Sequence, residues 1–220
     1  MLILNLSGRR ALQAVRAGFT LVELLAVMLI IGILVAFLLP KIPEVIDNAN
    51  VTACRSNLNE IGKGLMLHQT KHNSLPSQSG VAFFAALVAR DIWEATETST
   101  KKLTCPGVQL SSLTPSQEKI PMADWYKDLD RLDGGWSAYA GRDQKRFPIR
   151  KVTGKEVLVA DDNDPEGNHR TTTLALFGDY AVRSFEIVDE REAGRATPED
   201  EFVMVGPDAW IEDLRKLTLD

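Results

Sequence analysis

A short acidic run in the C-terminal half of the chain has residue types that could bind a metal ion. Asp162, Asp164, Glu166 and Gly167 match positions 1, 3, 5 and 6 of an EF-hand calcium loop. Position 12 would be Thr173, where such a loop needs a bidentate Glu, so an EF-hand is excluded. Two interpretations stay open: a weak calcium site at these acidic residues, or an ordinary solvated turn between strands. No other cofactor is predicted.

The chain contains two cysteines, Cys54 and Cys105. Both follow a long apolar segment and lie in the part that we expect to be exported, where disulfides persist. A Cys54–Cys105 bridge would tie two distant segments together, and closing a loop of this size stabilises a fold by about 4 kcal/mol in the loop-entropy model. The alternative is a pair of free thiols, with Cys54 on the apolar face of a helix.

Residue patterns that would support catalysis are incomplete. His68 and His72 have the i, i+4 spacing of helical zinc ligands, but Gln69 stands where a metalloprotease motif needs its Glu. We therefore predict a protein without enzymatic activity. The alternative from another class is a membrane-anchored enzyme or metal-binding module built on Asp162, Asp164 and His169.

The elements that position these residues begin with a membrane segment. From residue 19 to 39 the only charged side chain is Glu23. As a helix, this segment would span roughly 31 Å, close to the thickness of a bilayer core. Residues 1–18 carry three arginines and no acid, whereas the chain after residue 40 has 22 basic and 29 acidic residues. The positive-inside rule then places the N-terminus in the cytoplasm and the body across the membrane.

The overall charge bears on partners. The net charge is −5, which disfavours nucleic acid as a partner because nucleic-acid-binding proteins usually present a basic surface.

A carboxylate within an apolar segment is costly and suggests a function, so Glu23 needs a partner. Phe19 lies four residues before it, on the same helix face. The alternative is a Glu that merely reaches the cytoplasmic headgroups.

The run Gly18-Phe19-Thr20-Leu21-Val22-Glu23 resembles the prepilin signature of type IV pilins and type II secretion pseudopilins. The resemblance implies cleavage between Gly18 and Phe19 by a prepilin peptidase, followed by N-methylation of Phe19. It also implies that Glu23 pairs with the Phe19 amine of a neighbouring subunit and sets the register of a filament. The implied partners are the peptidase, other pilin or pseudopilin subunits, the inner-membrane assembly machinery and the lipid bilayer.

This family predicts a function and a location. The chain would be a structural subunit of a type II secretion pseudopilus or a related pilus-like filament, with a minor pilin for adhesion or DNA uptake as the nearest rival. It would be a single-pass bacterial inner-membrane protein with a periplasmic head. Four parts follow: a cleaved leader (1–18), a transmembrane helix half (19–39), an exported amphipathic half (40–72) and a globular head (73–220).

The residues after the apolar segment predict a long helix. Pro40 should kink it, and the pattern then continues to about residue 71. Two helices separated near Pro40 are the alternative. One apolar stripe in the second half should pack on the head. Its members are Cys54, Leu58, Ile61, Leu65 and His68.

The head is predicted to be α+β, a small antiparallel sheet on which the long helix packs. We expect a helix over 81–90, a loop over 106–125, and strands over 136–140, 156–160, 172–177 and 180–188. Gly178-Asp179 is a hairpin signal between the last two strands. Thr197-Pro198 and Gly206-Pro207 are typical of helix starts.

The head also resembles the pilin-like proteins named for an H-X9-DG motif. His169 is followed by nine residues and then Asp179, although Tyr180 replaces the Gly. We expect His169 and Asp179 to flank one hairpin and to hydrogen-bond to each other in a structural role.

Overall fold

The computed structural model describes residues 19–161 and 167–220. The chain divides into two compact units, residues 1–43 and residues 44–220. Each unit is described here by itself.

The first unit consists of α1 (Leu21–Leu38), which leads directly into a 3₁₀ turn over Leu39–Lys41. Pro40 stands at the start of this turn, where its missing N–H and its ring interrupt the α-helical hydrogen bonds. The expected interruption at Pro40 is thus a single turn, and the helical chain resumes at once as α2 (Ile42–His72). Within the described residues, one helical segment, Leu21–His72, is long and apolar enough to cross a membrane.

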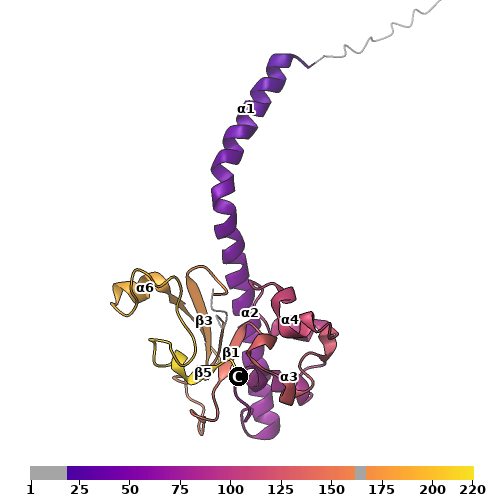
Figure 1. The fold of residues 1–220 in the computed structure, drawn as a ribbon, viewed down its shortest axis with the longest axis vertical. Coiled ribbons are helices and arrows are strands. Elements are labelled where there is room, and N and C mark those ends of the chain that lie inside the picture. The colour runs from indigo at the N-terminus through magenta and orange to yellow at the C-terminus, as the bar shows by residue number, and fades with distance from the viewer. Residues whose placement is uncertain (1–18, 162–166) are drawn as a thin grey trace, which may run out of the picture. The chain divides into compact units, whose positions relative to one another are not determined.

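The second unit is built on a five-stranded antiparallel sheet in the described part of the chain (Figure 1). Its order is β4-β3-β2-β1-β5. The strands are β1 (Tyr139–Arg142), β2 (Val157–Asp161), β3 (Thr172–Phe177), β4 (Val182–Glu186) and β5 (Leu217–Thr218). The prediction of an α+β fold with a small antiparallel sheet and a long N-terminal helix is confirmed.

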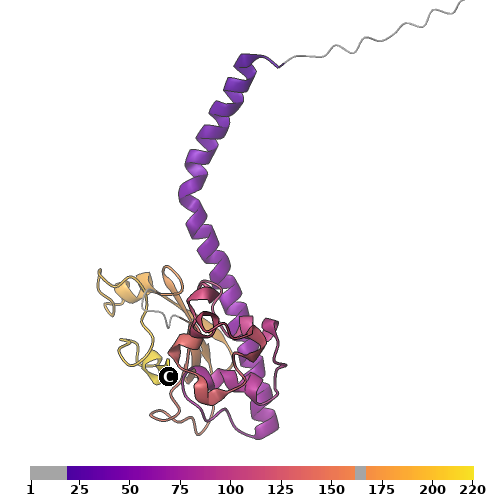
Figure 2. The same cartoon turned by 45° about the vertical axis from the view of Figure 1, so that its right-hand side comes forward.

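Both faces of this sheet are covered, which explains why the three central strands are buried along most of their length. One face packs against α2 and α3 (Val81–Ala89), while α6 (Ile187–Glu192) and the C-terminal segment cover the other. Figure 2 shows the yellow C-terminal segment and α2 on opposite sides of the sheet. The predicted stripe of α2 is confirmed, because all five of its residues, Cys54, Leu58, Ile61, Leu65 and His68, are buried.

The long segment between α3 and β1 is more structured than the predicted loop. It contains α4 (Glu97–Lys102), α5 (Thr114–Gln117) and four 3₁₀ turns: Leu110–Ser112, Met122–Asp124, Leu129–Arg131 and Gly134–Trp136. The strand expected over 136–140 was placed too early. The Asp133 side chain accepts a hydrogen bond from the Gly135 amide and closes the last turn, so the strand starts at Tyr139.

The C-terminal region differs most from the prediction. Neither helix expected after Thr197 or Gly206 is present; α6 begins at Ile187, and a 3₁₀ turn spans Leu214–Lys216. At the first site, the Asp200 carboxylate accepts hydrogen bonds from the amide and hydroxyl of Thr197. That side chain therefore closes a turn where the sequence pattern predicted a helix N-cap.

Gly141 in β1 lies against the start of α3 so closely that a side chain has no room. A Cβ at this position would lie 1.9 Å from the Gly80 carbonyl oxygen, a backbone atom. Gly141→Ala should therefore force these elements apart and lower the free energy of unfolding by about 3 kcal/mol. Denaturant unfolding of the full chain in detergent, followed by tryptophan fluorescence, measures this.

Gly62→Ala in α2 is the matched control. The nearest atom to its Cβ would be a terminal methyl of Leu176, at 3.0 Å, which can move aside, and the other neighbours are at ordinary contact distance. Ala also favours a helix by roughly 1 kcal/mol relative to Gly. We expect a net change below about 1 kcal/mol. Equal losses from the two variants would contradict the packing that we describe at Gly141.

Candidate functional site

The N-terminal end of α1 carries the predicted processing and assembly residues. Gly18 lies outside the described residues, while Phe19 is exposed. Thr20 is the helix N-cap and Glu23 is the third helical residue, and the two form a capping box. Glu23 Oε2 accepts hydrogen bonds from Thr20 N (2.9 Å) and Thr20 Oγ1 (2.8 Å), while Glu23 N donates to Thr20 Oγ1 (3.2 Å).

This capping box shows what Glu23 does within one uncleaved chain. Its carboxylate satisfies backbone and hydroxyl donors at the helix start, where a negative charge is also favoured by the helix dipole. In this chain Phe19 N is a peptide nitrogen, so an ammonium group would exist only after cleavage. The pairing of Glu23 with a Phe19 amine stays a prediction.

The remainder of α1 is apolar and uncovered. No residue of this helix is buried, and large apolar side chains such as Leu24, Met28 and Phe37 are more than half exposed. A contiguous apolar surface of this length requires a lipid or protein environment.

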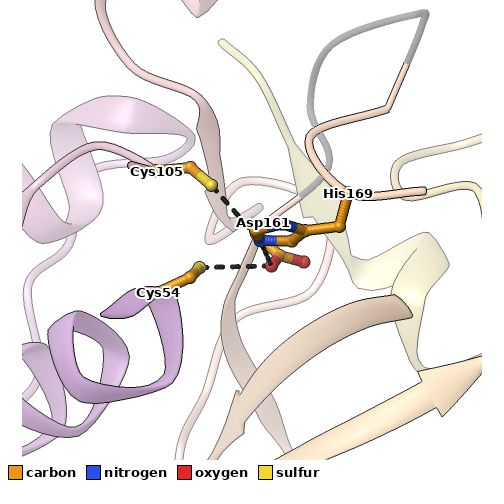
Figure 3. A group of neighbouring side chains, drawn as sticks. All are labelled: Cys54, Cys105, Asp161 and His169. Atoms are coloured by element: carbon orange, nitrogen blue, oxygen red, sulfur yellow. Dashed lines mark hydrogen bonds and ion pairs between the residues drawn. The ribbon is translucent and has the colours of Figure 1, made fainter. Parts of the chain in front are cut away.

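A second group of functional side chains lies inside the second unit, where four potential metal ligands meet. Cys54, Cys105, Asp161 and His169 are all buried, and their ligand atoms lie within 4.8 Å of one another. Figure 3 shows all four pointing toward a common centre. Cys54 Sγ is 3.2 Å from Asp161 Oδ2, and Cys105 Sγ is 3.4 Å from His169 Nε2. His169 Nε2 and Asp161 Oδ2 are 3.2 Å apart.

Four different segments bring these residues together. Cys54 belongs to the buried stripe of α2, and Cys105 follows α4 directly before Pro106. Asp161 is the last residue of β2, and His169 precedes β3. The antiparallel pairing of β2 with β3 thus places Asp161 and His169 at the same end of the sheet, beside α2.

Each member of the cluster has a further contact that fixes its orientation. Leu174 N donates to Asp161 Oδ1 at 2.6 Å, and Gly107 N donates to Cys105 Sγ at 3.3 Å. The Tyr139 hydroxyl is 3.3 Å from Cys54 Sγ. On the far side of the imidazole, Asp47 Oδ1 is 3.4 Å from His169 Nδ1.

The close packing of these groups shifts their pKa values in opposite directions. Burial raises the pKa of Cys54 well above its usual range. The hydrogen bond from Cys54, aided by His169, lowers the pKa of Cys105 to about 6 despite burial. Burial by itself would lower the pKa of His169, but hydrogen bonds to Asp161 and Cys105 raise it to about 10.

Two predictions about these residues are corrected by the structure. Where a disulfide was predicted, the structure has Cys54 and Cys105 as free thiols. Their sulfurs lie within hydrogen-bond distance of Asp161 and His169 respectively. His169 and Asp179 do not hydrogen-bond to each other. His169 turns into the cluster, whereas Asp179 lies in the turn after β3 and pairs with Arg183.

The other candidate ligands are placed differently. Asp162, Asp164 and Glu166 lie outside the described residues, so the calcium loop stays a prediction. His68 is buried in α2, and its Nδ1 lies 2.9 Å from the carbonyl oxygen of Ser74, just after this helix. This contact holds the end of the helix and gives His68 a structural role.

Sequence reasoning missed Asp161 and Asp47. Asp161 lies between the predicted strand over 156–160 and the acidic run that begins at Asp162, and it directly continues the apolar residues Val157-Leu158-Val159-Ala160. A carboxylate that extends a strand buried on both faces must itself be buried, and that is the signal that would have found it. Asp47 had no comparable signal, because it lies in a polar stretch of α2.

Comparison with known proteins finds a family-model match near the N-terminus and one partly similar curated protein. Residues 14–39 match the family model for the prokaryotic N-terminal methylation motif. The type II secretion system core protein G of Pseudomonas aeruginosa is 32% identical over 62 residues, which are 28% of this chain and 44% of that protein. The chain thus spans less than half of the length of this curated relative. No solved structure matches the chain. The chain thus carries the prokaryotic N-terminal methylation motif and is similar, over part of its length, to a type II secretion core protein.

Proposed function

We propose that the chain is a structural subunit of a type II secretion pseudopilus or a closely related pilus-like filament. Prepilin peptidase would remove residues 1–18 and methylate Phe19, and packing of α1 against other subunits would build the filament. The similarity to a secretion core protein favours a secretion pseudopilus over an adhesive pilus. The protein would perform no chemistry of its own.

One observation carries this proposal: an apolar helix without a single buried residue begins with the methylation motif. In lipid, such a helix stores the subunit in the membrane, where its backbone hydrogen bonds are satisfied internally. In a filament, the same apolar side chains pack between subunits. Either environment covers the surface that the isolated chain exposes.

The same proposal assigns a topology. The three arginines of residues 1–18 hold the N-terminus in the cytoplasm of the inner membrane. Residues 19–39 span the bilayer, and residues 40–72 carry the helix to a periplasmic head of residues 73–220. From residue 44 onward, the second half of that helix forms one compact unit with the head.

Processing provides the direct test. Coexpression with a prepilin peptidase should remove 18 residues and leave N-methyl-Phe19 as the new N-terminus, which mass spectrometry identifies. Gly18→Glu should abolish this cleavage because the peptidase must accept the residue before the cut. Gly32→Ala, in the middle of α1 with no atom within 4 Å of the added Cβ, should be processed normally.

A peptidase shown to be active on an established pseudopilin makes a negative result decisive. An intact Met1 in the presence of that enzyme, or a new N-terminus beyond residue 36, would exclude the proposed processing. The second result would indicate an ordinary secretory signal instead.

A further inference from the structure

We infer that Cys54, Cys105, Asp161 and His169 form a structural zinc site inside the head. The inference concerns a property separate from filament assembly, and it stands or falls independently of the proposed function. It rests on the donor set, on the distances between the donor atoms and on the contacts around them.

The donor set selects the metal. Two cysteine sulfurs, one imidazole nitrogen and one carboxylate oxygen are all ligands that zinc accepts in proteins. Soft thiolates disfavour calcium, magnesium and manganese, which prefer oxygen ligands alone. Four protein ligands also complete a tetrahedron, and this is the arrangement of a structural site; catalytic zinc keeps one position open.

The distances between donor atoms fit a tetrahedral ion. With zinc–sulfur bonds of about 2.3 Å and zinc–nitrogen or zinc–oxygen bonds of about 2.0 Å, adjacent donors should be roughly 3.3–3.5 Å apart. The measured separations are 3.2 Å for Cys54 Sγ to Asp161 Oδ2 and 3.4 Å for Cys105 Sγ to His169 Nε2. Nε2 to Oδ2 is 3.2 Å. These three pairs are close to tetrahedral spacing, and all four donor atoms lie within 4.8 Å of one another, so one ion can reach all of them.

The surroundings are those of a metal site. A zinc-bound histidine usually donates its other ring N–H to a carboxylate. Asp47 Oδ1 is 3.4 Å from His169 Nδ1, near enough to take this role, although the two do not form a hydrogen bond in this structure. Asp161 presents Oδ2 to the cluster while its Oδ1 is held by the Leu174 amide. The Gly107 amide points at Cys105 Sγ, as amides next to bound thiolates do.

A disulfide would explain less of this arrangement. It would use only the two sulfurs and leave Asp161, which has no exposed surface, in the core with a buried imidazole. Buried ion pairs rarely repay the cost of removing both charges from water. A zinc ion uses all four side chains and neutralises the two thiolates. It also joins α2 to the segments that carry Cys105, Asp161 and His169.

A cavity lies on one side of the cluster. It has a volume of about 390 Å³ and is lined by Cys105, Pro106 and Val108, among others. Zinc or a chelator would reach the site past Cys105. We therefore expect Cys105 to be the first thiol that reacts with an alkylating reagent once zinc is removed.

Metal analysis of the full chain, purified in detergent without chelators, tests the site. We expect about one zinc per chain by mass spectrometry of the element. Cys105→Ala should lose the metal, whereas His72→Gln, a matched histidine variant outside the cluster, should keep it. Removing zinc with a chelator should lower Tm by about 5 °C or more, and adding zinc back should restore it.

Cobalt substitution of the wild-type chain keeps the inference falsifiable if a variant fails to fold. Cobalt bound by two thiolates in a tetrahedral site gives a sulfur-to-cobalt charge-transfer band and intense visible bands. A chain that holds no zinc and carries a Cys54–Cys105 disulfide in peptide mapping would overturn the inference. Two reactive thiols without bound zinc, together with no cobalt charge-transfer band, would overturn it equally. Normal processing after Gly18 in either case would leave the proposed filament function intact.

Discussion

Replacing Glu23 by Gln should leave the chain inserted in the membrane and cleaved after Gly18, yet keep it out of filaments. Gln retains the capping box, since a Gln at the third helical position can accept the same hydrogen bonds from Thr20. The substitution removes only the negative charge. If that charge pairs with the Phe19 ammonium of a neighbouring subunit, the ammonium is left unpaired in an apolar environment. We expect about a tenfold or greater drop of the chain in sheared filaments.

Two further variants separate the charge from the cap. Glu23→Leu removes both and makes the helix more apolar, so insertion should be at least as efficient while assembly fails. Thr20→Ala breaks the capping box, because the hydroxyl no longer accepts from Glu23 N, but it keeps the carboxylate. This variant should still assemble.

Immunoblots of membrane and sheared fractions, with the processed N-terminus checked by mass spectrometry, measure all three variants. Filament incorporation of Glu23→Gln at the wild-type level would show that the carboxylate acts only as a helix cap. Loss of Thr20→Ala from filaments, together with full assembly of Glu23→Gln, would lead to the same conclusion. Loss of cleavage in Glu23→Gln would instead place the role of the charge at the peptidase.

The parts of the molecule that were predicted correctly depend on local pattern. The exposed apolar helix and its signature are contiguous in the sequence, and the buried stripe of α2 follows from helical periodicity alone. Strand β3 was predicted with its observed ends because an apolar run is bounded by a clear turn at Gly178-Asp179. In each case, one stretch of chain contained the whole signal.

The errors arise where a distant contact or a side chain decides the structure. Thr197-Pro198 has the composition of a helix start, but the Asp200 side chain closes a turn there. Spacing to Asp179 made His169 appear to be part of a hairpin motif, whereas the ring packs between Asp161 and Cys105 from other segments. Spacing along the chain does not tell which of several buried polar residues will share one site.

Asp161→Ala should be among the most destabilising single substitutions in the head and should lower the free energy of unfolding by about 3–5 kcal/mol. The side chain has no exposed surface. Its loss removes the partner of His169 and Cys54 and leaves the buried Leu174 amide without its acceptor. Asp161→Asn should cost less, because an amide oxygen can still accept from Leu174 N, although the charge beside the imidazole is lost.

Asp179→Ala is the matched control for this prediction. Asp179 also pairs with a basic side chain, Arg183, but both side chains are about two-fifths exposed. Asp179→Ala should therefore lower the free energy of unfolding by less than about 1 kcal/mol. Denaturant unfolding followed by tryptophan fluorescence reports on the head, because all four tryptophans, Trp93, Trp125, Trp136 and Trp210, lie in it. A loss for Asp161→Ala no larger than that for Asp179→Ala would mean that the buried cluster does not hold the head together. The largest loss of stability for Asp161→Ala, a smaller one for Asp161→Asn and the smallest for Asp179→Ala would instead show that the stability of the head depends on contacts made at Asp161. This residue is the one cluster member at the end of a central strand.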